Sequence, residues 1–179
     1  IGDVDILKKA PLRMIKAGFG DMVGKYSAIN DWKLSHAING EYYCGTVAKM
    51  VEDSLEKCIK TAEGLKDRKD NAIQNLMEGL VITGIAMSFT GNSRPASGSE
   101  HHLSHFIEMM YLFDGKEAPL HGEKVGVNTL VMNSLREKIS NMHPDLEKIK
   151  KIAQAFNKDK WTKDVKTLFR QAAPGVIRL

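Results

Sequence analysis

Apolar residues recur at steps of three and four along most of this chain, and this spacing places them on one face of an α-helix. The pattern runs through residues 21–38, 42–65, 71–89 and 125–139. No stretch of the sequence sustains the alternation of apolar and polar residues that a half-buried β-strand needs. The five prolines stand where a helix can begin or end: Pro11, Pro95, Pro119, Pro144 and Pro174. The sequence therefore predicts an all-α fold.

The helical pattern is interrupted near residues 39–40, 64–70, 90–97, 114–120, 140–144 and 157–160. These breaks predict a helical bundle of about seven or eight helices. Asn39-Gly40 follows a helical run, which is typical of a helix C-cap rather than a hairpin turn. The 179 residues contain no Pro- or Gly-rich linker, no low-complexity tract and no internal repeat, so we expect one domain over residues 1–179.

The composition of the chain indicates which kinds of partner it binds and in which cellular compartment it works. Lys and Arg number 26 against 22 Asp and Glu, and acidic residues interrupt the Lys-rich last third, which favours solvated helix faces over a nucleic-acid surface. The most apolar run, 80–89, is too short to span a membrane and predicts a core helix. Cys44 and Cys58 lack CxxC spacing, so we expect buried thiols in a reducing compartment, the cytoplasm.

Four of the six histidines fall between His101 and His121. The run that starts at Ser97 reads as a capping box closed by Glu100, with a helix beginning near Gly98. His101 and His105 then share one helix face, while His102 points about 100° away. Such a pair can line a metal or substrate site, or it can be two polar side chains on a half-buried face, and the pair alone leaves both interpretations open.

Two further segments carry possible ligands. His121 follows Pro119-Leu120 at a predicted helix start, where it can bind a metal or cap the helix. The motif Gly18-Phe-Gly-Asp21 opens an earlier predicted helix, and alone Asp21 is most simply an N-cap. Together, three helix starts offer one carboxylate and two histidines, a set suited to Zn²⁺, Ni²⁺ or Fe²⁺ with coordination positions left open.

Three motifs of this chain resemble, in their order and approximate spacing, motifs of the sn-glycerol-1-phosphate dehydrogenases. They are Gly18-Phe-Gly-Asp21, Ser93-Arg-Pro-Ala-Ser-Gly-Ser-Glu-His-His102 and His121-Gly-Glu-Lys-Val125. The same larger group contains glycerol dehydrogenase, the iron-containing alcohol dehydrogenases and dehydroquinate synthase. The resemblance extends over about residues 3–139, and the Ser-Arg-Pro-Ala-Ser-Gly-Ser-Glu-His run is its specific element. It implies the C-terminal helical domain of a dehydroquinate synthase-like enzyme.

The resemblance also implies roles for individual residues. Asp21, His101 and His121 match the family's metal ligands, with zinc as the first choice of metal and nickel or iron as alternatives. His105 matches a position that lines the substrate, and Asp21 contacts the substrate in this family as well, so both are candidate catalytic residues.

A phosphate contact is our own inference from the residues. Arg94 and its neighbours Ser93 and Ser97 lie beside a predicted helix N-terminus, and an Arg there makes a good anion site. A hydrogen bond that fixes the loop explains Arg94 equally well.

One part of the family pattern has no counterpart here. The family's N-terminal half binds the nicotinamide cofactor through a Gly-rich loop, whereas Gly18-x-Gly20 follows no clear strand and lacks the remaining spacing. The chain starts at Ile1 rather than Met. We therefore expect the helical half of a longer enzyme, with NAD or NADP bound mainly by an N-terminal nucleotide-binding domain that is absent from this chain.

The function implied by the resemblance is a metal-dependent oxidoreductase of phospholipid biosynthesis that interconverts dihydroxyacetone phosphate and sn-glycerol 1-phosphate with NAD(P)(H). Two alternatives are glycerol or other alcohol oxidation on the same scaffold, and a non-catalytic helical partner domain with structural histidines. The expected partners are a small phosphorylated substrate and the protein's own nucleotide-binding half, with a homo-oligomer left open. Nucleic acid and a membrane span are not expected.

Overall fold

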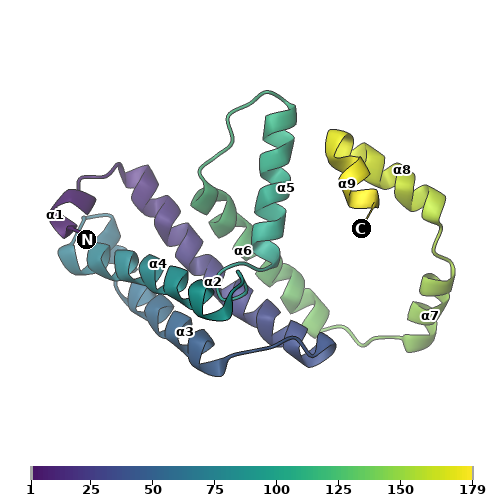
Figure 1. Cartoon of the computed structure of the whole chain (residues 1–179), viewed down its shortest axis with the longest axis horizontal. Coiled ribbons are helices and arrows are strands. Elements are labelled where there is room, and N and C mark those ends of the chain that lie inside the picture. Colours follow the sequence, from purple (N-terminus) through teal and green to yellow (C-terminus); the bar gives the residue numbers. More distant parts are fainter. Residues whose placement is uncertain (1, 179) are drawn as a thin grey trace. The chain divides into compact units, whose positions relative to one another are not determined.

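The computed structural model describes residues 2–178, and over this range every regular element is a helix (Figure 1). The all-α prediction is therefore confirmed. The α-helices are α1 Val4–Leu7, α2 Leu12–Asn39, α3 Gly45–Lys60, α4 Asp70–Thr90, α5 Ser99–Phe113, α6 His121–Ser140, α7 Leu146–Gln154, α8 Lys158–Phe169 and α9 Ala173–Ile177. Two short 3₁₀ turns cover Ala62–Leu65 and Arg170–Ala172.

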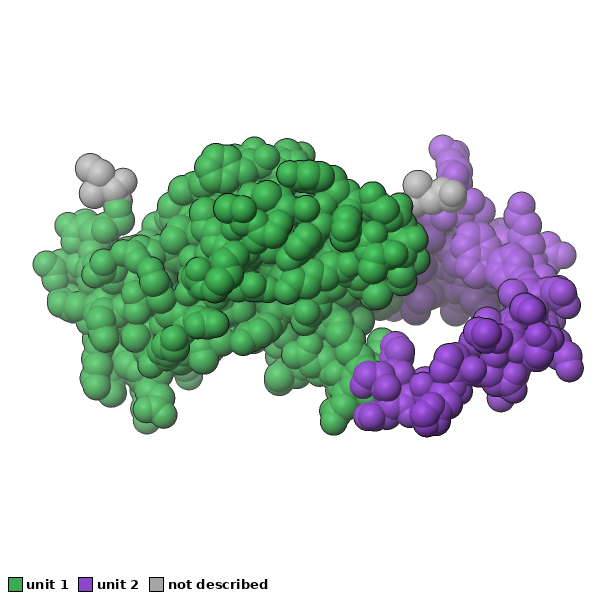
Figure 2. All heavy atoms as spheres, turned by 90° about the horizontal axis from the view of Figure 1, so that it is seen from below, with its two compact units in different colours: residues 1–137 green, residues 138–179 purple. Residues whose placement is uncertain are grey.

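The chain divides into two compact units, residues 1–137 and residues 138–179 (Figure 2). The prediction of one domain over residues 1–179 stays a prediction, and the two units are described separately. The first unit contains nearly all of the buried core and all of the predicted site residues. In the second unit, α7 buries no residue and leaves Leu146, Ile149 and Ile152 exposed.

The core of the first unit lies among α2, α3 and α4. Two clusters of buried side chains fill it, one towards each end of α2. The first contains Ile15, Met22, Leu55, Cys58, Leu65, Ala72, Ile73 and Leu76, and the second contains Ile29, Trp32, Val47, Ala48, Val51 and Ala86. The indole N–H of the fully buried Trp32 donates to the carbonyl of Tyr42 at 2.8 Å, so this large side chain leaves no polar group unpaired. α2 is therefore the central element.

The helix predicted from the apolar run 80–89 forms the second half of α4, with Thr83 and Ala86 buried in the core. Within residues 2–178, α4 is the one helix long and apolar enough to cross a membrane by length and composition. A single such helix is weak evidence for a span, because the core helix of a soluble protein has the same length and composition. The break predicted at residues 90–97 is also found. Gly91 ends α4 in the left-handed conformation, and α5 begins at Ser99.

α2 and α6 cross with their backbones in contact. A Cβ atom on Gly122 would lie 1.7 Å from the carbonyl oxygen of Ala17, and one on Gly20 would lie 2.2 Å from the carbonyl oxygen of Gly122. Larger residues at either position would force the helices apart.

This crossing explains an error in the sequence analysis. We expected a helix to start at Asp21 after Gly18-x-Gly20, but α2 begins at Leu12 and passes straight through Asp21. The glycine at position 20 serves close packing and does not break the helix. The predicted C-cap at the other end is confirmed, because Gly40 has φ 68° and its amide donates to the carbonyl of His36.

The crossing makes a testable prediction about stability. Gly122→Ala should lower the free energy of unfolding by about 1–3 kcal/mol or more, because the added methyl group meets backbone that cannot move aside. Gly84→Ala is the matched control in α4: its Cβ would meet nothing within 4 Å, so the free energy of unfolding should rise by roughly 0.5–1 kcal/mol. Urea denaturation of both variants measures the difference, and equal stabilities would contradict the close crossing.

Candidate metal centre

Three of the predicted residues meet at one point of the first unit. Asp21 comes from the middle of α2, His101 from the first turn of α5, and His121 is the first residue of α6. Their ligand atoms all lie within 4.8 Å of one another. Nε2 of His101 lies 3.4 Å and Nε2 of His121 lies 3.5 Å from the same oxygen, Oδ1 of Asp21. The structure thus brings together the three residues that the sequence singled out as a ligand set.

These separations fit a small divalent cation. Zinc takes nitrogen and carboxylate ligands at about 2.0–2.2 Å in tetrahedral geometry, which places two ligand atoms roughly 3.4 Å apart. The two distances from the Asp21 oxygen agree with that value. Three protein ligands of this kind would leave a coordination position open.

The carboxylate of Asp21 has a different partner on each oxygen. Oδ2 accepts a hydrogen bond from Nζ of Lys25 at 2.9 Å, and the almost completely buried Lys25 also donates to the carbonyl of Ala96 at 3.2 Å. Burial raises the pKa of Asp21, but the hydrogen bond with His101 and the charge of Lys25 lower it further, to about 2. Asp21 is therefore ionised at neutral pH, with Oδ1 turned towards the histidines.

The two histidines respond to their surroundings in opposite directions. Burial lowers the pKa of His101, yet its hydrogen bonds with Asp21 and Glu100 raise it more, so the pKa lies above its usual value. Burial also lowers the pKa of His121, and the attraction of Asp21 does not overcome this, so that pKa lies below its usual value. His121 is thus held in the neutral form that can bind a metal.

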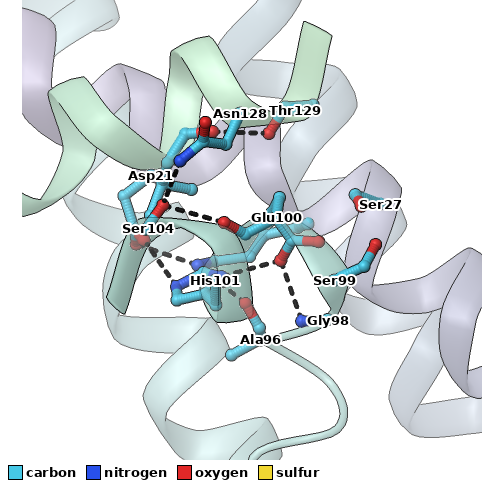
Figure 3. A network of polar contacts seen from close by, with 12 residues as sticks. Asp21, Ser27, Ala96, Gly98, Ser99, Glu100, His101, Ser104, Asn128 and Thr129 are labelled. Atoms are coloured by element: carbon cyan, nitrogen blue, oxygen red, sulfur yellow. Dashed lines mark hydrogen bonds and ion pairs between the residues drawn. The ribbon is translucent and has the colours of Figure 1, made fainter. Parts of the chain in front are cut away.

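Glu100 is a fully buried carboxylate that the sequence analysis misplaced. We predicted a capping box in which Ser97 and Glu100 exchange hydrogen bonds, and this is wrong. Ser97 belongs to the preceding turn, where its amide donates to the carbonyl of Ser93 at 2.8 Å. Oε1 of Glu100 instead accepts from the amide of Gly98 at 2.8 Å and lies 2.7 Å from Nδ1 of His101 (Figure 3).

The helix phase assumed for this segment is confirmed. The predicted start near Gly98 agrees with α5, whose N-cap is Gly98 and whose first residue is Ser99. His101 is buried, whereas the neighbouring His102 is exposed, as a turn of about 100° per residue requires. His105 stands one turn further along and remains exposed, with its ring centroid 6.4 Å from that of His101 and 5.9 Å from that of His121.

A cavity of about 290 Å³ adjoins the three residues. Lys25 and Ser97 line it together with Asp21, His101 and His121, and α4 contributes Leu80, Thr83, Gly84 and Met87. Of the three residues we expected at the phosphate, Ser97 therefore reaches the cavity. Lys25 was missed by the sequence analysis, although its position one turn after Asp21 is a signal for an ion pair.

Arg94 is engaged elsewhere. Its Nε donates to Oε1 of Glu41 at 2.7 Å, and its second guanidinium nitrogen lies 2.7 Å from the other oxygen of Glu41. The exposed Ser93 contributes its carbonyl to the turn before α5. Neither residue is among those that line the cavity. Of the two roles that the sequence left open for Arg94, these contacts favour the one that fixes the loop.

The chain was compared with protein-family models and with curated proteins. No family model matches the chain. It is 44% identical over 133 residues to a protein of Halalkalibacterium halodurans. The aligned region covers 74% of this chain and 33% of the relative. It is 39% identical over 159 residues to a protein of Geobacillus thermodenitrificans, which covers 89% of this chain and 39% of the relative. It is 39% identical over 132 residues to a protein of Pyrococcus horikoshii, which covers 74% of this chain and 37% of the relative.

All three relatives are named glycerol-1-phosphate dehydrogenase (NAD(P)+). This chain spans about a third of the length of the relatives it matches. The resemblance that its motifs indicated is confirmed: the chain is homologous to the C-terminal part of the glycerol-1-phosphate dehydrogenases.

Proposed function

We propose that this chain is the metal- and substrate-binding half of an NAD(P)-dependent oxidoreductase that interconverts dihydroxyacetone phosphate and sn-glycerol 1-phosphate. The observation that carries the proposal is the meeting of Asp21, His101 and His121 in one cluster. The names of the relatives supply the substrate and the cofactor. The reaction belongs to the whole protein, of which this chain represents about a third by the length of its relatives.

The ligands in this proposal are Oδ1 of Asp21 and the imidazoles of His101 and His121. Zinc is the first choice because two imidazoles and one carboxylate with an open position are typical of its catalytic sites, and nickel or iron would accept the same ligands. A bound divalent metal would supply Lewis-acid polarisation of the substrate's carbonyl or hydroxyl oxygen.

The chain's own side chains would position the substrate. His105 lies on the exposed side of the cluster, within reach of a substrate that enters from solvent. Lys25 and Ser97 face the cavity, and the apolar wall from α4 would limit the water around the reacting carbon. Lys25 also holds Oδ2 of Asp21, which keeps Oδ1 free to bind the metal.

The remaining parts of the proposal concern what lies outside this chain. We propose that the nicotinamide cofactor is bound mainly by a nucleotide-binding half of the protein, and that the active site forms between the two halves. We place the enzyme in the cytoplasm, where the free thiols of Cys44 and Cys58 are maintained.

The ligand set can be tested in the 179-residue chain. His101→Ala and His121→Ala should each lower zinc affinity by more than about 100-fold, because loss of a direct ligand costs more than loss of a supporting hydrogen bond. The helical circular dichroism should persist. His102→Ala is the matched control on the same helix and should bind zinc as the parent chain does. A result in which His102 is essential and His101 is dispensable would contradict the assignment.

The electrostatics of the metal-free chain predict two separate titrations. By NMR, His101 should titrate above its ordinary value of 6.5 and His121 below it. Protonated His101 adds to the free energy of unfolding. This contribution is complete below pH 6.5 and is lost as the pH rises through the pKa of His101 in the folded state. His121 has the opposite effect. Its neutral form contributes to the free energy of unfolding above pH 6.5, and this contribution is lost as the pH falls through the pKa of His121 in the folded state.

Asp21→Asn provides the control for these titrations, because it removes the carboxylate that raises the pKa of His101. In this variant the pKa of His101 should fall relative to the parent chain. The assignment of the two environments fails if the order of the two midpoints in the parent chain is reversed.

The division of labour between the two halves predicts the behaviour of the isolated chain. It should be helical and bind zinc, yet show no turnover with NAD(P)H, because hydride transfer needs the nucleotide-binding half. Addition of that half from a relative, in cis or as a separate chain, should restore activity. Comparison of dihydroxyacetone phosphate with dihydroxyacetone in the restored enzyme then tests the phosphate preference, which the pairing of Arg94 with Glu41 leaves open. Turnover by the chain alone would disprove the proposal.

A further inference from the structure

Glu100 is buried without being part of the ligand set. Its side chain is 0% exposed, and acidic side chains are rarely buried to this extent unless they are paired. One oxygen, Oε1, has two partners, while Oε2 is buried and makes no hydrogen bond of ordinary geometry among residues 2–178, although the side chain of Ser27 interacts with the carboxylate and lowers its pKa. Burial alone would raise the pKa of Glu100, but its interactions with His101, Ser27 and the amide of Gly98 lower it, so the role of this ionised carboxylate lies with those partners.

The partner of Glu100 on the side of the metal cluster is His101. Nδ1 of this ring lies 2.7 Å from Oε1 of Glu100, and since a carboxylate oxygen accepts, Nδ1 is the nitrogen that carries the hydrogen. In the neutral ring, Nε2 is then left with its lone pair. This is the nitrogen that lies 3.4 Å from Oδ1 of Asp21, in the ligand cluster.

Glu100 is itself held by the scaffold. Its Oε1 accepts from the amide of Gly98, the N-cap of α5. The backbone of Glu100 is also fixed, because Oγ of Ser104 donates to its carbonyl at 2.8 Å and in turn accepts from Nδ2 of Asn128 in α6 at 3.0 Å (Figure 3). The amide of Gly98 therefore holds the carboxylate beside the imidazole, on a stretch of backbone that is linked to α6 through Ser104 and Asn128.

Within the described part of the chain, neither His121 of the cluster nor the adjacent His105 has comparable support. Nδ1 of His105 lies 3.7 Å from the nearest oxygen of Glu108, which is beyond hydrogen-bond distance. His121 is half exposed, and its polar contact within residues 2–178 is the one with Asp21. The buried carboxylate thus acts on one ligand specifically.

We propose that Glu100 is a positioning residue that fixes His101 as the Nδ1–H tautomer and directs its Nε2 towards the metal. Ligating histidines commonly donate their second N–H to a carboxylate, which orients the ring and makes the ligating nitrogen more basic. The effect on metal affinity rests on the proposed function, whereas the tautomer is a property of the metal-free chain.

The tautomer can be measured directly by ¹⁵N NMR of the metal-free chain at about pH 9, well above the ordinary histidine pKa. In the parent chain, His101 should show a protonated Nδ1 and a bare Nε2. Glu100→Ala should shift His101 towards the Nε2–H form, which predominates for free imidazole side chains in water. Glu100→Gln retains an acceptor oxygen and should keep Nδ1–H.

A second variant guards against misfolding of Glu100→Ala. Glu100→Asp keeps the negative charge but withdraws the carboxylate by one methylene, so it should also lose the Nδ1–H preference. Unchanged Nδ1–H in folded Glu100→Ala or Glu100→Asp would overturn the proposal, and so would an Nε2–H tautomer in the parent chain.

Zinc affinity supplies the second readout, measured by competition with a chelator. Glu100→Ala and Glu100→Asp should bind zinc about 10–100-fold more weakly than the parent chain, and Glu100→Gln should lose less. Glu108→Gln, another carboxylate of α5, is the control and should bind as the parent does. Parental affinity in Glu100→Ala would overturn the role in metal binding. If the parent chain itself binds no zinc, the proposed function fails, and the tautomer measurement still decides the role of Glu100.

Discussion

The site depends on the close crossing of α2 and α6. The two helices approach until the backbone at Gly122 touches the backbone at Ala17, and no side chain fits between them. Because His121 is the residue directly before Gly122, this contact sets the distance between its imidazole and Asp21. A bulkier crossing would move Asp21 on α2 and His121 on α6 out of reach of each other. The packing of α2 against α6 therefore also sets the geometry of the proposed ligand set.

The carboxylate of Asp21 shows how the charges in this crossing are balanced. A buried lysine occupies one oxygen and two histidines face the other. A buried ion pair contributes little net stability when desolvation of both charges is counted, so stability alone does not account for Lys25. Its ammonium keeps the carboxylate ionised and turned in one direction. The site is thus arranged before any ligand binds.

The sequence predicted the fold well and the local reasons for the site poorly. Helical spacing and the prolines were enough for the all-α fold, because both signals are local. Asp21, His101 and His121 were found as a set because motif order carries information about the family. The Gly18-x-Gly20 pair misled the analysis, since a glycine that breaks a helix and a glycine that admits a neighbouring helix look the same in sequence.

Tertiary neighbours account for the other differences. Glu100 fits the spacing of a capping box, yet its side chain is drawn to Gly98 and His101 by burial that no local pattern reveals. Arg94 has an anion-binding context in sequence, but Glu41, 53 positions away, pairs with it. The pairing of Lys25 with Asp21 follows helical spacing, whereas its bond to Ala96 spans 71 positions.

The separation of the ligands along the chain has a consequence for folding. Asp21 and His121 lie 100 positions apart, and the loop between them contains α3, α4 and α5. The entropy of closing such a loop is recovered only when those helices have packed, so the cluster should assemble late in folding rather than act as its nucleus. Any ion that binds the finished cluster but not the open chain would shift the folding equilibrium towards the native state by mass action. With the proposed metal site, metal supply would then change the fraction of the first unit that is folded.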